Sequence, residues 1–455
     1  MMALPSSGAD PRVSRGIAIA HGDVLNWAAV LVWAVGFLDI VTGHGLPQVI
    51  PAATCVLFCL VVVPAVNRAG YFPILLALVG LVAFSLPQQS ADPTWQGLVY
   101  GTRLGAFMFS ILLLRQVLLD LAPLARARER FATMVPMDQK GAAVLLSGAF
   151  SSIFSFGTYA LLGPLVRDHT AQERRAFGAV MLCGGTLTLM ITPFSVGWFY
   201  ATRLVPEANM ALLVPVLAVV WGTGAVVAIA LHGRLSVRAV WGAVASVAPL
   251  TLPLVLYGVV LAVTCHLTGL GVTEAITAAT PLVYLLFYLV RRAVVGRPPL
   301  LTRMREAGTR AGRGLVEVLL YSSSLAFALA VIESGVVGHL LSDLLVAYPP
   351  RAVLVTMALV TPLVGAAGFH PSVPTALAVI VGQSILPADS AGTAILLLGL
   401  VWWAGASMLA FSSVSLWGAC TEFDCTPRSV ILGRNILVVV AVSVATALAI
   451  ATGVV

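Results

Sequence analysis

Charged residues are scarce in this sequence. Asp, Glu, Lys and Arg make up 9% of the 455 residues, whereas hydrophobic residues make up 60% and the mean hydropathy is +1.02. A soluble domain has no means of burying so much apolar surface, so the composition predicts an all-α polytopic membrane protein. The net charge of +7 lies mostly in short loops, where it orients a membrane protein. We therefore expect the lipid bilayer, and no nucleic acid, as a partner.

The sequence also lacks the motifs of enzymes. It has no Walker A phosphate loop, no dinucleotide-binding glycine fingerprint, no His-Glu-x-x-His and no convincing nucleophile elbow. Cys420 and Cys425 flank two acidic residues, but their spacing matches no zinc pattern and no histidine is near. The arginines at positions 12 and 15 precede no apolar core with a cleavage site, so no removable signal peptide is expected. These absences predict a protein that is not an enzyme and that has no cofactor.

Long apolar runs are abundant instead. A helix needs about 20 apolar residues to cross about 30 Å of hydrocarbon. The sequence predicts about 11 transmembrane helices, near residues 24–43, 48–66, 71–87, 97–121, 176–202, 209–231, 240–266, 274–293, 315–335, 393–418 and 429–453. A cytoplasmic tail, 1–23, is expected to precede a single transmembrane domain, 24–455.

Two further apolar stretches, 138–166 and 351–386, are interrupted by polar and helix-breaking residues. The second holds Gly368-Phe369-His370-Pro371-Ser372 at its centre, and the first holds Ser151 to Thr158. Non-helical chain at membrane depth is tolerated only where protein or water satisfies the freed backbone groups, which marks a cavity. Each stretch is therefore predicted to be a re-entrant hairpin whose tip lines a solute site.

The basic residues support this topology. If both stretches are hairpins, all but four of the 25 Lys and Arg residues fall in loops on one side, including the cluster 291–313. A single span at 138–166 would move that cluster outside, against the positive-inside bias. For 351–386 the bias gives weaker support. The amino terminus is therefore expected in the cytoplasm and the carboxyl terminus outside, in a bacterial-type inner (cytoplasmic) membrane.

The two halves of the chain resemble each other in the order of their elements. Each half has five spans and one hairpin, preceded by a short amphipathic piece (121–131 and 337–347) and followed by a helix with a polar, breakable centre. An odd number of spans makes the halves inverted repeats, about 48–231 and 240–453, as is common in secondary transporters. Without a gap, Thr192 aligns with Ser412 and Ser195 aligns with Ser415. The helix at 24–43 is the extra element.

With eleven spans, two hairpins and broken fifth and tenth helices, the chain resembles the ion-transporter superfamily, which includes the divalent anion:sodium symporters. The resemblance implies that solute and coupling ions bind where the hairpin tips meet the broken helices, that the site moves by an elevator motion, and that the protein forms a homodimer. The sodium-dependent symporters carry Ser-Asn-Thr at both tips. This sequence has no asparagine at either tip, so the solute and the coupling ion, Na⁺ or H⁺, stay open.

The predicted site gathers hydroxyls, glycines and prolines at these breaks. Half-helix N-termini suit an anionic group, and hydroxyls with carbonyls suit Na⁺ at the hairpin tips. His370 is the sharpest candidate, because an ionisable residue within a membrane is a functional hypothesis by default; it could also satisfy backbone groups of the hairpin. The predicted binding residues are Ser151, Ser152, Ser155, Gly157, Thr158, Thr192, Pro193, Ser195, Gly368, His370, Pro371, Ser372, Thr375, Ser412, Ser413 and Ser415.

The hairpins and broken helices hold no deep carboxylate, which argues against an organic cation. The sequence thus predicts a secondary active transporter of a small organic anion, such as a carboxylate, coupled to Na⁺ or H⁺. An exporter or antiporter for an inorganic oxyanion or an amphipathic compound is the alternative within transport. A membrane-embedded enzyme or a partner subunit is the alternative from another class. Arg103, about 9 Å inside its helix, could neutralise a solute anion or snorkel to the outer headgroups, and snorkelling is the expected role.

Overall fold

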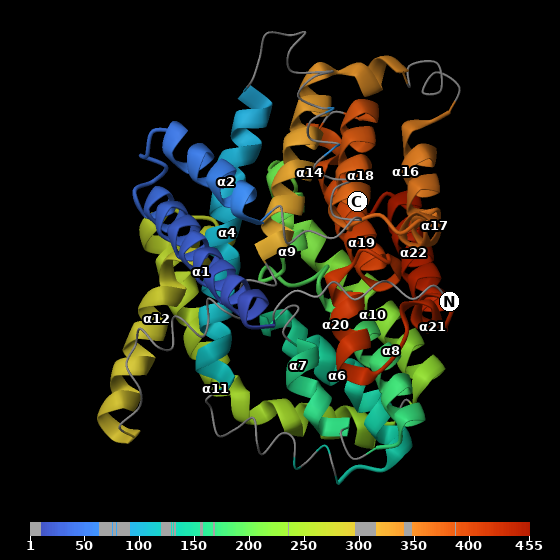
Figure 1. Ribbon diagram of the computed structural model, residues 1–455. Helices are drawn as coiled ribbons and strands as arrows, with labels where there is room; N and C mark the ends of the chain where they lie inside the picture. Colours follow the sequence, from blue (N-terminus) through green and yellow to red (C-terminus); the bar gives the residue numbers. More distant parts are fainter. Residues whose placement is uncertain are drawn as a thin grey trace.

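A computed structural model describes most of the chain (Figure 1). The described residues are 11–62, 75, 79, 92–119, 129, 131, 133–154, 158–166, 169–234, 236–295, 315–340, 348–386 and 388–455. Within them the secondary structure is helical and contains no strand. The all-α class predicted from the apolar runs is therefore confirmed for this part of the chain.

The helices follow the apolar runs of the sequence closely. The predicted span at 71–87 and the amphipathic pieces at 121–131 and 337–347 lie largely outside the described residues. The described elements are α1 (Pro11–Val41), α2 (Val49–Val62), α4 (Asp92–Leu119), α6 (Pro136–Phe154), α7 (Thr158–Leu162), η5 (Gly163–Val166), α8 (Ala171–Thr188), α9 (Val196–Leu204), α10 (Met210–His232), α11 (Val237–Thr268), α12 (Val272–Val295), α14 (Leu315–Ser334), α16 (Pro350–Leu359), α17 (Thr361–Ala366), α18 (Ser372–Ile385), α19 (Ala388–Leu409), α20 (Val414–Phe423), α21 (Pro427–Ile431) and α22 (Asn435–Ala451).

Four segments of the described chain are long and apolar enough to cross a membrane: Trp95–Leu114, Met210–His232, Val272–Leu289 and Ala391–Phe423. Shorter apolar helices accompany them, including α2, α18 and α22. This pattern is consistent with a membrane protein. The first helix differs from its prediction, because α1 begins at Pro11 and so includes part of the expected tail.

Helices are interrupted at the places where the sequence contains its breakers. The run 176–202 divides into α8 and α9, and the run 393–418 divides into α19 and α20. The stretch 351–386 divides into α16, α17 and α18, with residues 367–371 between the last two. In Figure 1, α6 and α7 lie in the lower half of the molecule and α16 to α18 in the upper half. The two interrupted stretches thus approach the middle from opposite ends.

The prediction for Arg103 was wrong. Its Nε donates to Oδ2 of Asp39 at 2.7 Å, and both residues are buried, at 9% and 1% exposed. A guanidinium that finds a buried carboxylate gains a charge-assisted hydrogen bond and has no need to reach the headgroups. This ion pair joins α1 to α4, which also packs against α2, α12 and α14.

Candidate functional site

The first break, between α8 and α9, is held by two hydroxyl groups. Thr192 Oγ1 donates to the carbonyl of Ser152, near the end of α6, at 2.8 Å. Ser195 caps α9: its Oγ accepts from the Trp198 amide at 3.0 Å and donates back to the Leu189 carbonyl at 2.7 Å. A serine at an N-cap satisfies one of the free amides of the first turn. The break is therefore an ordered structure tied to the tip of the first interrupted stretch.

The second break, between α19 and α20, is built in the same way. Ser412 Oγ donates to the carbonyl of Gly368, between α17 and α18, at 2.9 Å. Ser413 caps α20: its Oγ accepts from the Leu416 amide at 3.3 Å and donates back to the Ser407 carbonyl at 2.7 Å. Gly368 has a φ of +85°, a conformation that an L side chain rarely adopts.

Close glycine contacts precede both breaks. A Cβ on Gly184 in α8 would overlap the Val144 carbonyl of α6, and a Cβ on Gly148 would lie 2.7 Å from the Thr188 hydroxyl. In the second half, a Cβ on Gly365 would lie 3.1 Å from the Gly405 carbonyl of α19. Glycine at these positions allows each broken helix to approach its own hairpin arm closely. Glycine contact, tip hydrogen bond and N-cap thus occur in the same order twice.

The structure corrects one detail of the alignment between the halves. The gapless comparison paired Ser195 with Ser415, but the capping residue of α20 is Ser413. Thr192 and Ser412 occupy corresponding positions, as predicted, because both hydroxyls donate to a tip carbonyl. The chain between hydroxyl donor and cap is longer in the first half, where Pro193 and Phe194 intervene. Ser415 is buried within α20 beside Tyr159.

Each half also contacts the other half. The post-break helix α9 packs against α18 of the second stretch, and α20 packs against α7 of the first. The broken helices meet directly as well, since α19 contacts both α8 and α9. The structure thus brings both breaks, the Ser152 end of α6 and the Gly368 tip into one region in the middle of the molecule (Figure 1).

His370 lies at the second tip and belongs to a buried chain of polar groups. Its Nδ1 is 2.8 Å from Ser372 Oγ, and Ser372 Oγ donates to Ser324 Oγ in α14 at 2.8 Å. His370, Ser372 and Ser324 are 3%, 0% and 1% exposed. The sequence interpretation missed Ser324, although three consecutive serines, 322–324, in an apolar helix are a visible signal. The hydroxyls of Ser322 and Ser323 donate to carbonyls of α14 itself, whereas the Ser324 hydroxyl accepts from the tip.

Aromatic rings surround this chain. The rings of His370 and Tyr321 are 5.0 Å apart, and Tyr321 lies 5.2 Å from Trp403 and 6.5 Å from Tyr200, measured between centroids. The Tyr200 hydroxyl is fully buried, and it has no hydrogen-bond partner among the described residues. Leaving a buried hydroxyl unpaired costs about 1–3 kcal/mol. A partner outside the described protein atoms, such as water or a solute, would remove that cost.

The other predicted residues occupy varied positions. Ser155 and Gly157 lie outside the described residues. Thr158 is buried at the start of α7, and its hydroxyl has no partner in the described part of the chain. Ser151 is buried, and Gly185 lies close to it and to Tyr159. Thr375 donates to the Gly399 carbonyl at 3.2 Å, Pro193 is half-buried in the first break, and Pro371 precedes α18.

The chemistry of the breaks is that of neutral donors and acceptors. The segments 189–195, 367–371 and 410–413 contain hydroxyls, backbone groups and one imidazole, and no carboxylate. Ser195 and Ser413 each satisfy one amide of the helix that follows, so first-turn amides remain at α9 and α20. No group of three or more His, Cys, Asp or Glu residues within the described chain is arranged to hold a metal ion. The arrangement suits a small anion better than a cation.

No protein-family model matches the chain, and no curated protein sequence matches it.

Proposed function

We propose that the protein is a secondary active transporter that moves a small organic anion, such as a carboxylate, with Na⁺ or H⁺ as the coupling ion. One observation carries the proposal. Two broken helices each donate a hydroxyl hydrogen bond to the tip of an interrupted helical stretch, Thr192 to Ser152 and Ser412 to Gly368. Breaks of this kind at membrane depth belong to protein that lines a cavity, and paired breaks are typical of transporters with inverted repeats.

The orientation of the two stretches supports re-entrant hairpins. They approach the middle of the molecule from opposite ends (Figure 1), as expected if one hairpin enters from the cytoplasm and the other from outside. About 11 spans, a cytoplasmic amino terminus, an outside carboxyl terminus and an inner-membrane location complete the proposed topology. The site would then move between the two sides with the broken helices and hairpins as one body.

The residues at the breaks favour an anionic solute. Amides of the first turns of α9 and α20 provide donors with partial positive charge. The hydroxyls of Thr192 and Ser412 and the carbonyls that they contact provide oxygen atoms for Na⁺. His370 is the one titratable side chain in the segments 189–195, 367–371 and 410–413, so it is the candidate carrier of a coupling proton.

Uptake into proteoliposomes tests the function directly. A panel of radiolabelled organic acids would be offered under an imposed Na⁺ gradient and, separately, under an imposed proton gradient. We expect one acid to accumulate above its equilibrium level under one of the gradients. With a proton gradient as the driving force, His370→Gln should abolish accumulation but leave exchange of internal for external solute. Absence of accumulation under either gradient would rule out the symporter.

A further inference from the structure

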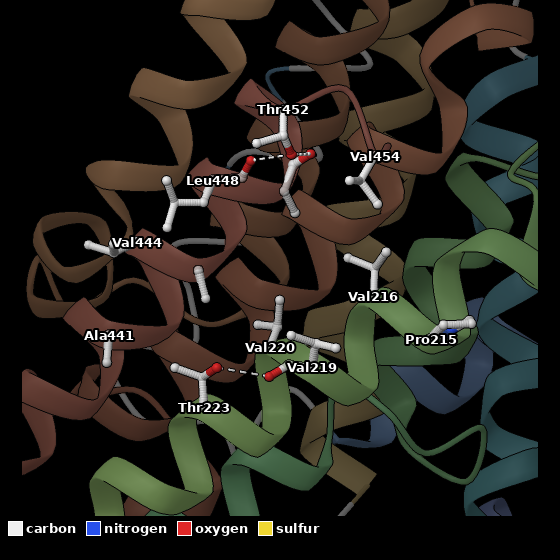
Figure 2. Close-up of a pocket in the computed structure, with 12 residues that line it drawn as sticks. Pro215, Val216, Val219, Val220, Thr223, Ala441, Val444, Leu448, Thr452 and Val454 are labelled. Atoms are coloured by element: carbon white, nitrogen blue, oxygen red, sulfur yellow. Dashed lines mark hydrogen bonds between the residues drawn. The ribbon is translucent and has the colours of Figure 1, made fainter.

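A long apolar groove runs along the surface between α10 and α22 (Figure 2). Its volume is about 810 Å³, within the range of sites that hold a whole ligand. Thr452 and Val454 lie at one end, and Thr223 and Ala441 lie at the other (Figure 2). Its lining residues are Pro215, Val216, Val219, Val220, Thr223, Ala441, Val444, Ala445, Leu448, Ala449, Thr452 and Val454.

The groove offers no polar group to an occupant. Its two hydroxyls are used within their own helices: Thr223 donates to the Val219 carbonyl at 2.9 Å, and Thr452 donates to the Leu448 carbonyl at 2.8 Å. Val219 and Leu448 are 68% and 59% exposed, so the walls present apolar surface without cover. An extended hydrocarbon chain matches this apolar surface. Each methylene group that it buries in the groove stabilises the complex by about 0.8 kcal/mol.

A cation stands at the Thr452 end. A Cβ on Gly453 would lie 3.2 Å from a terminal nitrogen of Arg351, so this guanidinium lies against the backbone between the groove residues Thr452 and Val454. Arg351 is exposed and forms no ion pair with a described residue. Tyr348 is 57% exposed three positions earlier. An arginine in the first turn of α16 and a tyrosine just before that helix are typical of the level of lipid headgroups.

From these observations we infer that the groove binds one phospholipid, with an acyl chain between α10 and α22 and its phosphate on Arg351. Guanidinium groups bind phosphate through paired, charge-assisted hydrogen bonds, and basic pockets beside membrane helices hold anionic headgroups. The inference requires that the protein lie in a membrane but does not depend on transport. It assigns a function to an apolar surface that includes no residue of either helix break.

Native mass spectrometry of the detergent-purified full chain, titrated with phosphatidylglycerol, tests the site. We expect one retained phospholipid per chain. Arg351→Gln should raise the apparent Kd for phosphatidylglycerol by about tenfold, because the variant loses a charge-assisted hydrogen bond to the phosphate. Ala445→Trp should abolish retention by filling the groove, and Ala449→Leu provides a milder version if the tryptophan variant fails to fold. Val255→Trp, at an exposed position of α11, is the matched control and should bind like the wild type.

Two outcomes would overturn the inference. If the three groove variants and Val255→Trp all retain phospholipid equally, the lipid belongs to a general shell around the protein. If Ala445→Trp abolishes retention but Arg351→Gln leaves the apparent Kd unchanged, the phosphate does not lie on Arg351. A titration with diacylglycerol, which has acyl chains but neither a phosphate nor any other charge, should show binding that is insensitive to Arg351→Gln.

Discussion

The break between α8 and α9 is longer than the break between α19 and α20. The first covers residues 189–195 and contains Pro193, whereas the second covers 410–413 and contains no proline. Both nevertheless keep a hydroxyl that donates to a tip carbonyl and a serine cap that donates back to a carbonyl six residues earlier, Leu189 in the first half and Ser407 in the second. The two breaks therefore share the same hydrogen bonds, although the number of residues between the hydroxyl donor and the cap differs.

The two tips differ in chemistry. The second tip carries His370, which continues through Ser372 to Ser324 in α14. The described part of the first tip offers hydroxyls, including Thr158, and no titratable side chain. If the protein is a transporter, this difference assigns the proton-sensitive step to the second half. The first half would contribute neutral oxygen and amide groups.

The largest expected difference between the halves is in the glycine contacts. Gly184→Ala places a Cβ onto the Val144 carbonyl, which is backbone and has little freedom to move. We expect it to lower the apparent free energy of unfolding by about 1–3 kcal/mol, as overpacking does. A Cβ on Gly405 would lie 2.9 Å from the methyl group of Thr361. Because this is a side-chain atom, Gly405→Ala should lower the apparent free energy of unfolding by less than Gly184→Ala does. Thermal unfolding in detergent measures both; equal losses would contradict the difference.

Removing the caps should affect both halves alike. Ser195→Ala and Ser413→Ala each remove an N-cap and one hydrogen bond to a buried carbonyl, and should each cost about 2 kcal/mol of apparent stability. Ser443→Ala is the control, because Ser443 is buried inside α22, its hydroxyl donates to the Val439 carbonyl of the same helix, and it caps nothing. If Ser195→Ala were harmful but Ser413→Ala cost no more than Ser443→Ala, the correspondence between Ser195 and Ser413 would be wrong.

A smaller effect is expected at the hydroxyls that contact the tips. Thr192→Val and Ser412→Ala each delete the hydrogen bond to a tip carbonyl, worth about 1 kcal/mol. Thr192→Val also removes the acceptor of a longer hydrogen bond, 3.3 Å, from the Phe194 amide. Because the bonds to the tip carbonyls join a broken helix to a tip, we expect both variants to fold and to lose solute uptake in proteoliposomes. Thr223→Val, which removes a hydroxyl bonded only within α10, should retain uptake. Full uptake by Thr192→Val and Ser412→Ala would show that these hydrogen bonds are not needed for transport.

The smallest effect concerns the start of α8. Thr170 and Glu173 form a capping box, and hydrogen bonds from the Thr170 backbone and side chain lower the pKa of Glu173 below its usual value. A lowered folded-state pKa gives stability that is present above the unfolded pKa of about 4.3 and is lost as pH falls through the folded value. Wild type should therefore exceed Glu173→Gln in thermal stability at neutral pH, and the gap should close in acid. A constant gap would contradict this linkage.

The sequence predicted where helices are interrupted, because Pro193, Gly368 and Pro371 stand inside apolar runs and leave few alternatives. It did not predict the partners. The Ser152 and Gly368 carbonyls, Ser324 and the Asp39–Arg103 pair depend on packing between segments far apart in the chain. The pairing of Ser195 with Ser413 was missed because a gapless alignment has no means of representing breaks of unequal length.

Access to the second tip from both sides of the membrane is the central claim. It can be measured with a single cysteine at position 369, because Phe369 is 41% exposed. The six native cysteines would first be replaced, and the resulting variant must retain uptake. A membrane-impermeant maleimide would be added to right-side-out and to inside-out vesicles. Phe369→Cys should react from both sides, in proportions that solute or the coupling ion changes, whereas a control cysteine at the exposed Val237 should react from one side only. Reaction of Phe369→Cys from a single side under every condition would contradict alternating access.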